Sequence, residues 1–123
     1  MERIKFEKLV ESGLLLIPEK FRHLMKNVDI VIDDYPTQEQ LRKSRIGSGR
    51  TLLGLYEGIP QTQRTTNYAN VLPDKITIFQ KPIEGIAQTP LAIENLVANT
   101  VWHEIAHHFG LNETEVRNIK RNV

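Results

Sequence analysis

Alternating apolar and polar residues predict three strands in the middle of the chain. In residues 28–33 (VDIVID) the aliphatic residues at 28, 30 and 32 alternate with Asp29, Val31 and Asp33. This period of two indicates a strand with one buried face, which ends before Pro36. Residues 51–60 (TLLGLYEGIP) and 75–83 (KITIFQKPI) show a similar pattern bounded by Gly or Pro, so they predict the second and third strands.

Helical spacing of apolar residues precedes the first strand. Residues 2–12 predict an amphipathic helix, and Gly13 is a plausible end for it. A second short helix is expected at residues 18–25, where Pro18 occupies a first-turn position that needs no backbone donor. The polar segments at 37–50 and 61–74 contain turn-forming residues and are expected to be loops.

A long helix is expected near the end of the chain. From Pro90 to Phe109 apolar residues recur at helical intervals. Thr89 is a favourable N-cap and Pro90 a favourable first residue, while Gly110 suits the left-handed conformation that ends many helices. The sequence therefore predicts one helix with both of its ends marked.

Beyond this helix, Asn112 followed by Glu115 resembles a capping box, and a short basic helix is expected to follow. Helices then flank three strands, a pattern that predicts an α+β domain with a small sheet. At 123 residues the chain, 1–123, is expected to be a single domain. The pattern does not decide the order of the strands.

Composition and charge narrow the possible functions. The net charge of +1 argues against nucleic acid or an anionic membrane as the main partner. No apolar run is long enough for a membrane span or a signal peptide, so a cytoplasmic protein is expected. The chain has no cysteine, and a metal site can therefore use only His, Asp and Glu. The sequence does not indicate an oligomeric state.

The segment TVWHEIAHHFGLNETEV, residues 100–116, carries the candidate chemistry. His103 and His107 are four residues apart on the expected helix, so both rings can reach one ion. Glu104 is rotated by about 100° from His103 and can reach a water on that ion. This HExxH pattern is typical of a Zn²⁺ site in which the glutamate is the general base. Zinc lowers the pKa of its water from about 15.7 to around 7.

A catalytic zinc needs a third protein ligand. Glu113 is the first candidate, because the chain turns back after Gly110 and brings an acid towards the same ion. Glu115 is the alternative, although its expected place in the capping box gives it another role.

These residues also resemble a known family. HEIAHHFGLNE is similar to the signature of the small bacterial zincin-like metallopeptidases, and its spacing matches the metzincin HExxHxxGxxH with Glu113 in place of the third histidine. Flanking resemblance extends over residues 6–34, 52–60 and 72–83. The resemblance implies a minimal zincin fold, in which a small mixed sheet packs on the active-site helix, with zinc as cofactor and a peptide or protein as substrate. The methionine turn of metzincins is missing, since both methionines precede the motif.

Several alternatives remain open at this stage. HExxH also occurs by chance on helices without any metal. The protein can be a zinc-binding module without proteolytic activity, or a metal-dependent RNA-associated hydrolase that uses the basic residues 42–50. His108 is expected to be a hydrogen-bonded core residue or a support for the site. Tyr56 or Tyr68 is a candidate donor to an oxyanion, and simple packing is the alternative for both.

A substrate peptide is expected to align by strand addition. The candidate strands for this addition are LLGLYEG, residues 52–58, and KITIFQ, residues 75–80.

Overall fold

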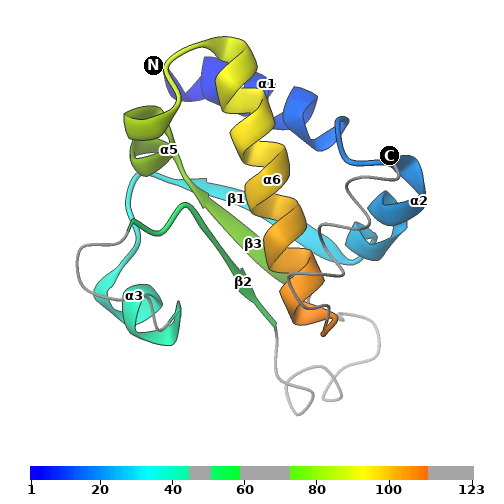
Figure 1. The fold of residues 1–123 in the computed structure, drawn as a ribbon. Helices are drawn as coiled ribbons and strands as arrows, with labels where there is room; N and C mark the ends of the chain where they lie inside the picture. The colour runs from blue at the N-terminus through cyan, green and yellow to red at the C-terminus, as the bar shows by residue number, and fades with distance from the viewer. Residues whose placement is uncertain (45–50, 59–72, 111–123) are drawn as a thin grey trace.

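A computed structural model describes residues 1–44, 51–58 and 73–110. Three strands and six helical segments follow one another along these parts of the chain (Figure 1). In order they are α1 (Arg3–Leu14), α2 (Glu19–Arg22), η1 (His23–Met25), β1 (Val28–Asp33), α3 (Gln38–Ser44), β2 (Gly54–Glu57), β3 (Asp74–Phe79), α5 (Gln80–Ile86) and α6 (Pro90–His108). The architecture is α+β, as the sequence pattern predicts.

The three predicted strands form one mixed sheet in the order β1-β3-β2. β1 runs parallel to β3 with Val28 opposite Asp74, and β2 runs antiparallel to β3 with Gly54 opposite Ile78. Because β3 is central, β1 and β2 form the two edges of this sheet. The third strand is shorter than predicted, since it ends at Phe79 and the chain continues as α5. Pro82 explains the change, because its missing N–H is tolerated in the first turn of a helix but not within a central strand.

The hydrophobic core lies between the sheet and the two long helices. On one face of the sheet, Ile76 and Ile78 are fully buried against Val97, Val101 and Ile105 of α6. α1 packs against α6, as the crossing of the two helices in Figure 1 illustrates. The opposite face carries a second cluster around Leu52, Leu55 and Phe79, against which Leu41 of α3 packs.

The crossing of α1 and α6 corrects one sequence prediction. Gly13 does not end α1, which continues to Leu14, and Gly13 itself is buried. A Cβ at Gly13 would lie only 2.7 Å from the carbonyl oxygen of Glu94 and 3.3 Å from Val97. The glycine therefore permits close approach of the two helices.

Helix α3 is a second correction, because residues 37–50 were expected to be a loop. The backbone N–H of Gln40 donates to Thr37 Oγ1 at 3.0 Å, and the backbone N–H of Thr37 donates to Gln40 Oε1 at 2.9 Å. This reciprocal pair is a capping box with glutamine as its fourth residue. Gln40 Nε2 also donates to Glu57 Oε1 at 3.1 Å, which ties α3 to β2.

The expected boundaries of the long helix are confirmed. Thr89 Oγ1 accepts a hydrogen bond from the N–H of Ala92 at 3.2 Å, and Pro90 opens α6. The helix ends at His108, and Gly110 has the positive φ of 81° expected at this position. The capping box at Asn112 and Glu115 lies outside the described residues. No helix in the described segments has both the length and the apolar character that a membrane span requires.

We expect Gly13→Ala to lower the free energy of unfolding by about 1–3 kcal/mol, because the new Cβ separates α1 from α6. Gly85→Ala in α5 is the matched control, since a Cβ there meets nothing within 4 Å. The control is expected to be neutral or to stabilise by up to about 1 kcal/mol. Urea denaturation of both variants measures the difference; equal effects would show that the helix crossing does not need a glycine.

Candidate functional site

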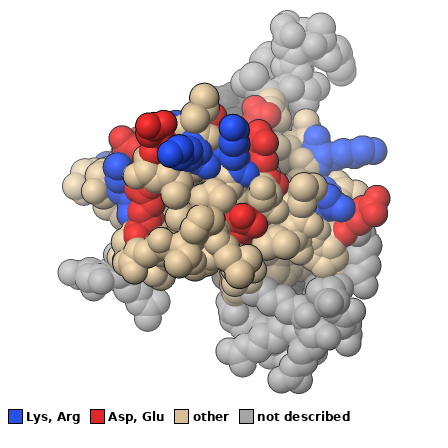
Figure 2. All heavy atoms as spheres, turned by 90° about the horizontal axis from the view of Figure 1, so that it is seen from above, with Lys and Arg blue, Asp and Glu red and all other residues tan. Residues whose placement is uncertain are grey.

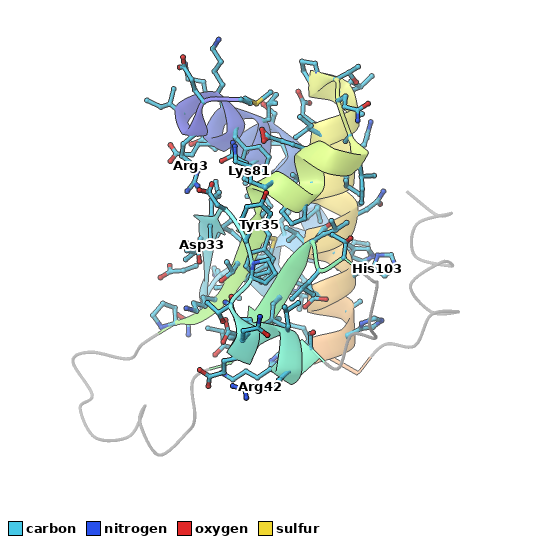
Figure 3. The ribbon with its side chains drawn as sticks, turned by 90° about the vertical axis from the view of Figure 1, so that its left-hand side faces the viewer. Arg3, Asp33, Tyr35, Arg42, Lys81 and His103 are labelled. Atoms are coloured by element: carbon cyan, nitrogen blue, oxygen red, sulfur yellow. The ribbon has the colours of Figure 1, made fainter. Side chains whose placement is uncertain are left out.

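His103 and His107 lie one turn apart on α6. Their ring centroids are 6.0 Å apart, with an angle of 80° between the ring planes. His103 is half-buried and His107 is exposed. In Figure 3 the His103 side chain projects outward from α6, on the side away from Asp33 of β1. Two imidazoles therefore face outward from the same helix, next to one another.

The His103 ring is held by the backbone of its own helix. Its Nδ1 lies 3.0 Å from the carbonyl oxygen of Asn99, one turn earlier. A carbonyl oxygen can only accept, so this contact requires the proton on Nδ1. In the neutral ring the lone pair then lies on Nε2, a nitrogen that can bind a metal ion. The acceptor is a main-chain oxygen, so the contact does not depend on which side chain stands at position 99. The sequence alone therefore could not indicate this hydrogen bond.

Glu104 points from α6 towards the outer edge of β2. Its Oε1 accepts a hydrogen bond of 2.8 Å from the backbone N–H of Tyr56. Burial raises the pKa of the Glu104 carboxyl above its usual range, and the hydrogen bond from Tyr56 partly offsets this effect. A carboxylate that is partly desolvated and fixed at one oxygen has the properties of a general base.

A cleft of about 330 Å³ opens beside these residues, between α6 and the start of β2. Polar and titratable side chains line this cleft together with apolar ones. The lining residues are His103, Glu104, Asn99, Thr100, Leu52, Leu53, Gly54 and Leu96. An apolar cleft with a few convergent polar groups is the usual form of a small-molecule or peptide subsite.

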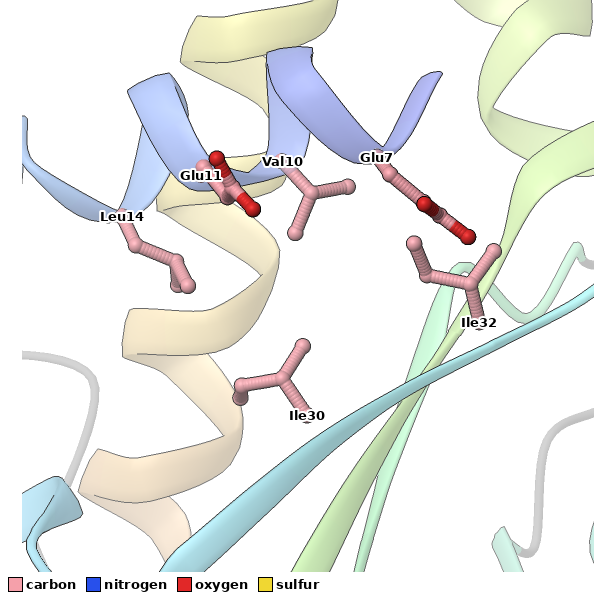
Figure 4. A pocket seen from close by; sticks show the side chains of 6 residues that line it. All are labelled: Glu7, Val10, Glu11, Leu14, Ile30 and Ile32. Atoms are coloured by element: carbon pink, nitrogen blue, oxygen red, sulfur yellow. The ribbon is translucent and has the colours of Figure 1, made fainter. Parts of the chain in front are cut away.

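A second groove, of about 370 Å³, lies between α1 and β1 and has no histidine among its lining residues. Its walls are aliphatic apart from the carboxylates of Glu7 and Glu11 (Figure 4). β1 and β2 are opposite edges of the three-stranded sheet, so this groove is separate from the cleft at Glu104.

Tyr56, Asp74 and His108 form a cluster at the C-terminal end of α6. The Tyr56 hydroxyl donates to Asp74 Oδ2 at 2.5 Å, so this hydroxyl is directed at Asp74 rather than held ready for an oxyanion. His108 stacks on the Tyr56 ring with centroids 3.9 Å apart. The expectation that His108 is a core residue is wrong, because its side chain is exposed. Asp74 was missed, since only strand pairing brings it next to Tyr56.

Comparison with known proteins now decides the family. A family model for zincin-like metallopeptidases matches residues 25–122, which includes the sheet, α6 and the HExxH motif. The chain belongs to the zincin-like metallopeptidase family. The resemblance inferred from HEIAHHFGLNE is thereby confirmed at the level of the family.

One solved structure of similar fold is a conserved hypothetical protein from Thermo thermophilus. It is 23% identical in sequence, with a TM-score of 0.52, over 85% of this chain and 90% of that one. At this level of identity the similarity concerns the fold. The search of curated proteins found no match.

The zincin-like family implies zinc, and the donor set on α6 fits that ion. Two imidazoles that share one tetrahedral zinc hold their ring centres roughly 5 Å apart. The observed 6.0 Å therefore needs only a small side-chain rotation. Within the described residues no third His, Asp or Glu completes a metal-binding group with this pair. Glu113 and Glu115, the candidates for the third ligand, lie outside those residues.

On the face seen in Figure 2, basic and acidic side chains are interspersed rather than gathered by sign. This agrees with the net charge of +1. Most of the basic segment 42–50 lies outside the described residues, so the alternative of an RNA-associated hydrolase that uses this segment is not tested.

The contact between β2 and α6 gives a direct test of this geometry. A Cβ at Gly54 would lie 2.7 Å from Thr100 Cγ2 and 3.3 Å from the carbonyl oxygen of Thr77. Because χ1 of a threonine is restricted in a helix, we expect Gly54→Ala to destabilise the protein by about 1–3 kcal/mol. Thr100→Ser removes the methyl group and should restore most of this loss in the double variant. Additive effects in urea denaturation would contradict the close contact.

Proposed function

We propose that the protein is a zinc-dependent peptidase in which His103, His107 and Glu113 bind the metal and Glu104 is the general base. The observation that carries the proposal is the position of Glu104. Its carboxylate is held by the Tyr56 N–H at 2.8 Å and lines a cleft together with His103. Membership of the zincin-like metallopeptidase family supports the same chemistry.

The two oxygens of Glu104 have different roles in this proposal. Oε1 accepts the hydrogen bond from Tyr56, which leaves Oε2 to take a proton from the attacking water. Bound zinc would supply the Lewis acidity that makes this water acidic at neutral pH. Glu104 then passes the proton to the leaving amine, so that the peptide bond breaks without release of an amide anion.

The outer edge of β2 is the proposed place for the substrate backbone. β3 is the central strand, so the alternative alignment on KITIFQ is excluded by the sheet order. The Tyr56 N–H points away from β3, and in an antiparallel pair the backbone groups of Gly54 lie on the same side. Because Glu104 accepts from the Tyr56 N–H, an extended peptide would pair with the backbone of Gly54 on this edge. An apolar side chain of the peptide would enter the cleft near Leu52, Leu53 and Leu96.

Removal of one histidine tests the metal site. We expect His103→Ala and His107→Ala each to weaken zinc binding by more than about 100-fold, because loss of a direct ligand costs more than loss of an outer-shell partner. His23→Ala is the control, since His23 is an exposed histidine on a different element. Calorimetric titration with zinc and elemental analysis provide the measurement. Unchanged binding in both variants would exclude the site.

Glu104→Gln separates a peptidase from a zinc-binding protein without activity. The amide keeps the shape of the side chain but cannot accept the proton, so hydrolysis should fall by about 10²–10⁴-fold while zinc binding persists. Cleavage of a mixed peptide library, followed by mass spectrometry, detects the difference. A wild-type protein that binds zinc but cleaves no peptide would favour the non-proteolytic alternative.

A further inference from the structure

Tyr56 contacts helix α6 and strand β3 through three different groups. Its backbone N–H donates to Glu104 Oε1 at 2.8 Å. Its ring stacks on His108, with centroids 3.9 Å apart and an interplanar angle of 14°. Its hydroxyl donates to Asp74 Oδ2 at 2.5 Å. One residue of the edge strand is thus bound to both the helix and the neighbouring strand.

Asp74 is a firm anchor for this contact. It is only 8% exposed, it opens β3, and its backbone N–H donates to the carbonyl oxygen of Asn27 at 3.2 Å. The same Oδ2 that accepts from Tyr56 lies 3.9 Å from His108 Nε2. A Cβ at Gly58 would lie 3.6 Å from Asp74 Oδ1 and 3.8 Å from His108 Cε1, so a side chain at this position would be in van der Waals contact with both residues.

The residues of α6 that Tyr56 contacts are the sequence neighbours of the two proposed histidine ligands. Glu104 directly follows His103, and His108 directly follows His107. The cluster therefore holds the residue next to each proposed histidine ligand and fixes the rotation and height of the last turn. A metal site tolerates ligand distances only within about 0.2 Å of their ideal values, so the exact position of the last turn of α6 affects zinc binding.

We infer that Tyr56 is a positioning residue for the zinc site, which it serves through its hydrogen bonds to Asp74 and Glu104 and through its stacking on His108. The inference rests on the proposed function. In this role Tyr56 acts through Glu104 and His108 rather than on the metal itself. It holds the Glu104 carboxylate at one oxygen and the final turn of α6 against the sheet, and the ring of His107 is placed as a consequence.

Conservative variants test the inference in the intact chain. Tyr56→Phe removes only the hydroxyl and keeps the ring and the backbone N–H, whereas His108→Ala removes the exposed stacking partner. Each variant should weaken zinc binding by about 10-fold, the lower end of the loss seen for outer-shell partners. Tyr35→Phe is the control, because Tyr35 is 66% exposed and lies outside the cluster. Competition with a chromophoric zinc chelator measures the affinity, and urea denaturation of the metal-free protein measures stability.

The pattern of results separates four outcomes. Weaker zinc binding in Tyr56→Phe and His108→Ala, at concentrations where both are folded, supports positioning. Lower stability of the metal-free protein with unchanged zinc affinity would overturn the inference, since it describes a purely structural contact. Wild-type protein that binds no zinc would overturn both the inference and the proposed function, whereas tight wild-type binding with unaffected variants would overturn the inference alone.

Discussion

The contact between the outer edge of β2 and helix α6 is the constraint on which the site depends. Gly54 allows the strand to approach Thr100, and the Tyr56 N–H then reaches the Glu104 carboxylate at 2.8 Å. A buried carboxylate is costly unless it is hydrogen-bonded, and a strand edge leaves alternate N–H groups for such bonds. The N–H of the strand edge and the carboxylate of the glutamate therefore provide each other with a hydrogen-bond partner, and the candidate site lies at this contact.

Helix α6 has two different functions on two of its faces. Val97, Val101 and Ile105 are fully buried against the sheet and α1. His103 and His107 lie on another face, one turn apart, where they can reach a common ion. The helical period thus places the two proposed metal ligands on a helix whose other face is buried in the core. Rigid support of this kind is what a metal site needs from its scaffold.

Much of this arrangement could be predicted from local patterns, because the responsible interactions are local. Thr89, Pro90 and Gly110 mark the ends of α6 by their own backbone preferences, and the spacing of His103 and His107 is a property of any helix. Helix α3 was not predicted because its segment is polar and lacks clear apolar periodicity, although Thr37 and Gln40 have the spacing of a capping box. The role of Gly13 was misread, since a small residue at a helix crossing looks the same in the sequence as a helix stop. The cluster of Tyr56, Asp74 and His108 could not be predicted at all, because it depends on strand register and on where α6 crosses the sheet.

Diffraction from crystals of the zinc-loaded protein, recorded just above the zinc absorption edge, tests the central claim most directly. We expect one anomalous peak at about 2.0–2.2 Å from Nε2 of His103, Nε2 of His107 and a carboxylate oxygen of Glu113. A peak bound by other residues, or by Glu115 in place of Glu113, would contradict the proposed ligand set. Zinc-loaded crystals with no peak at α6 would contradict the site itself.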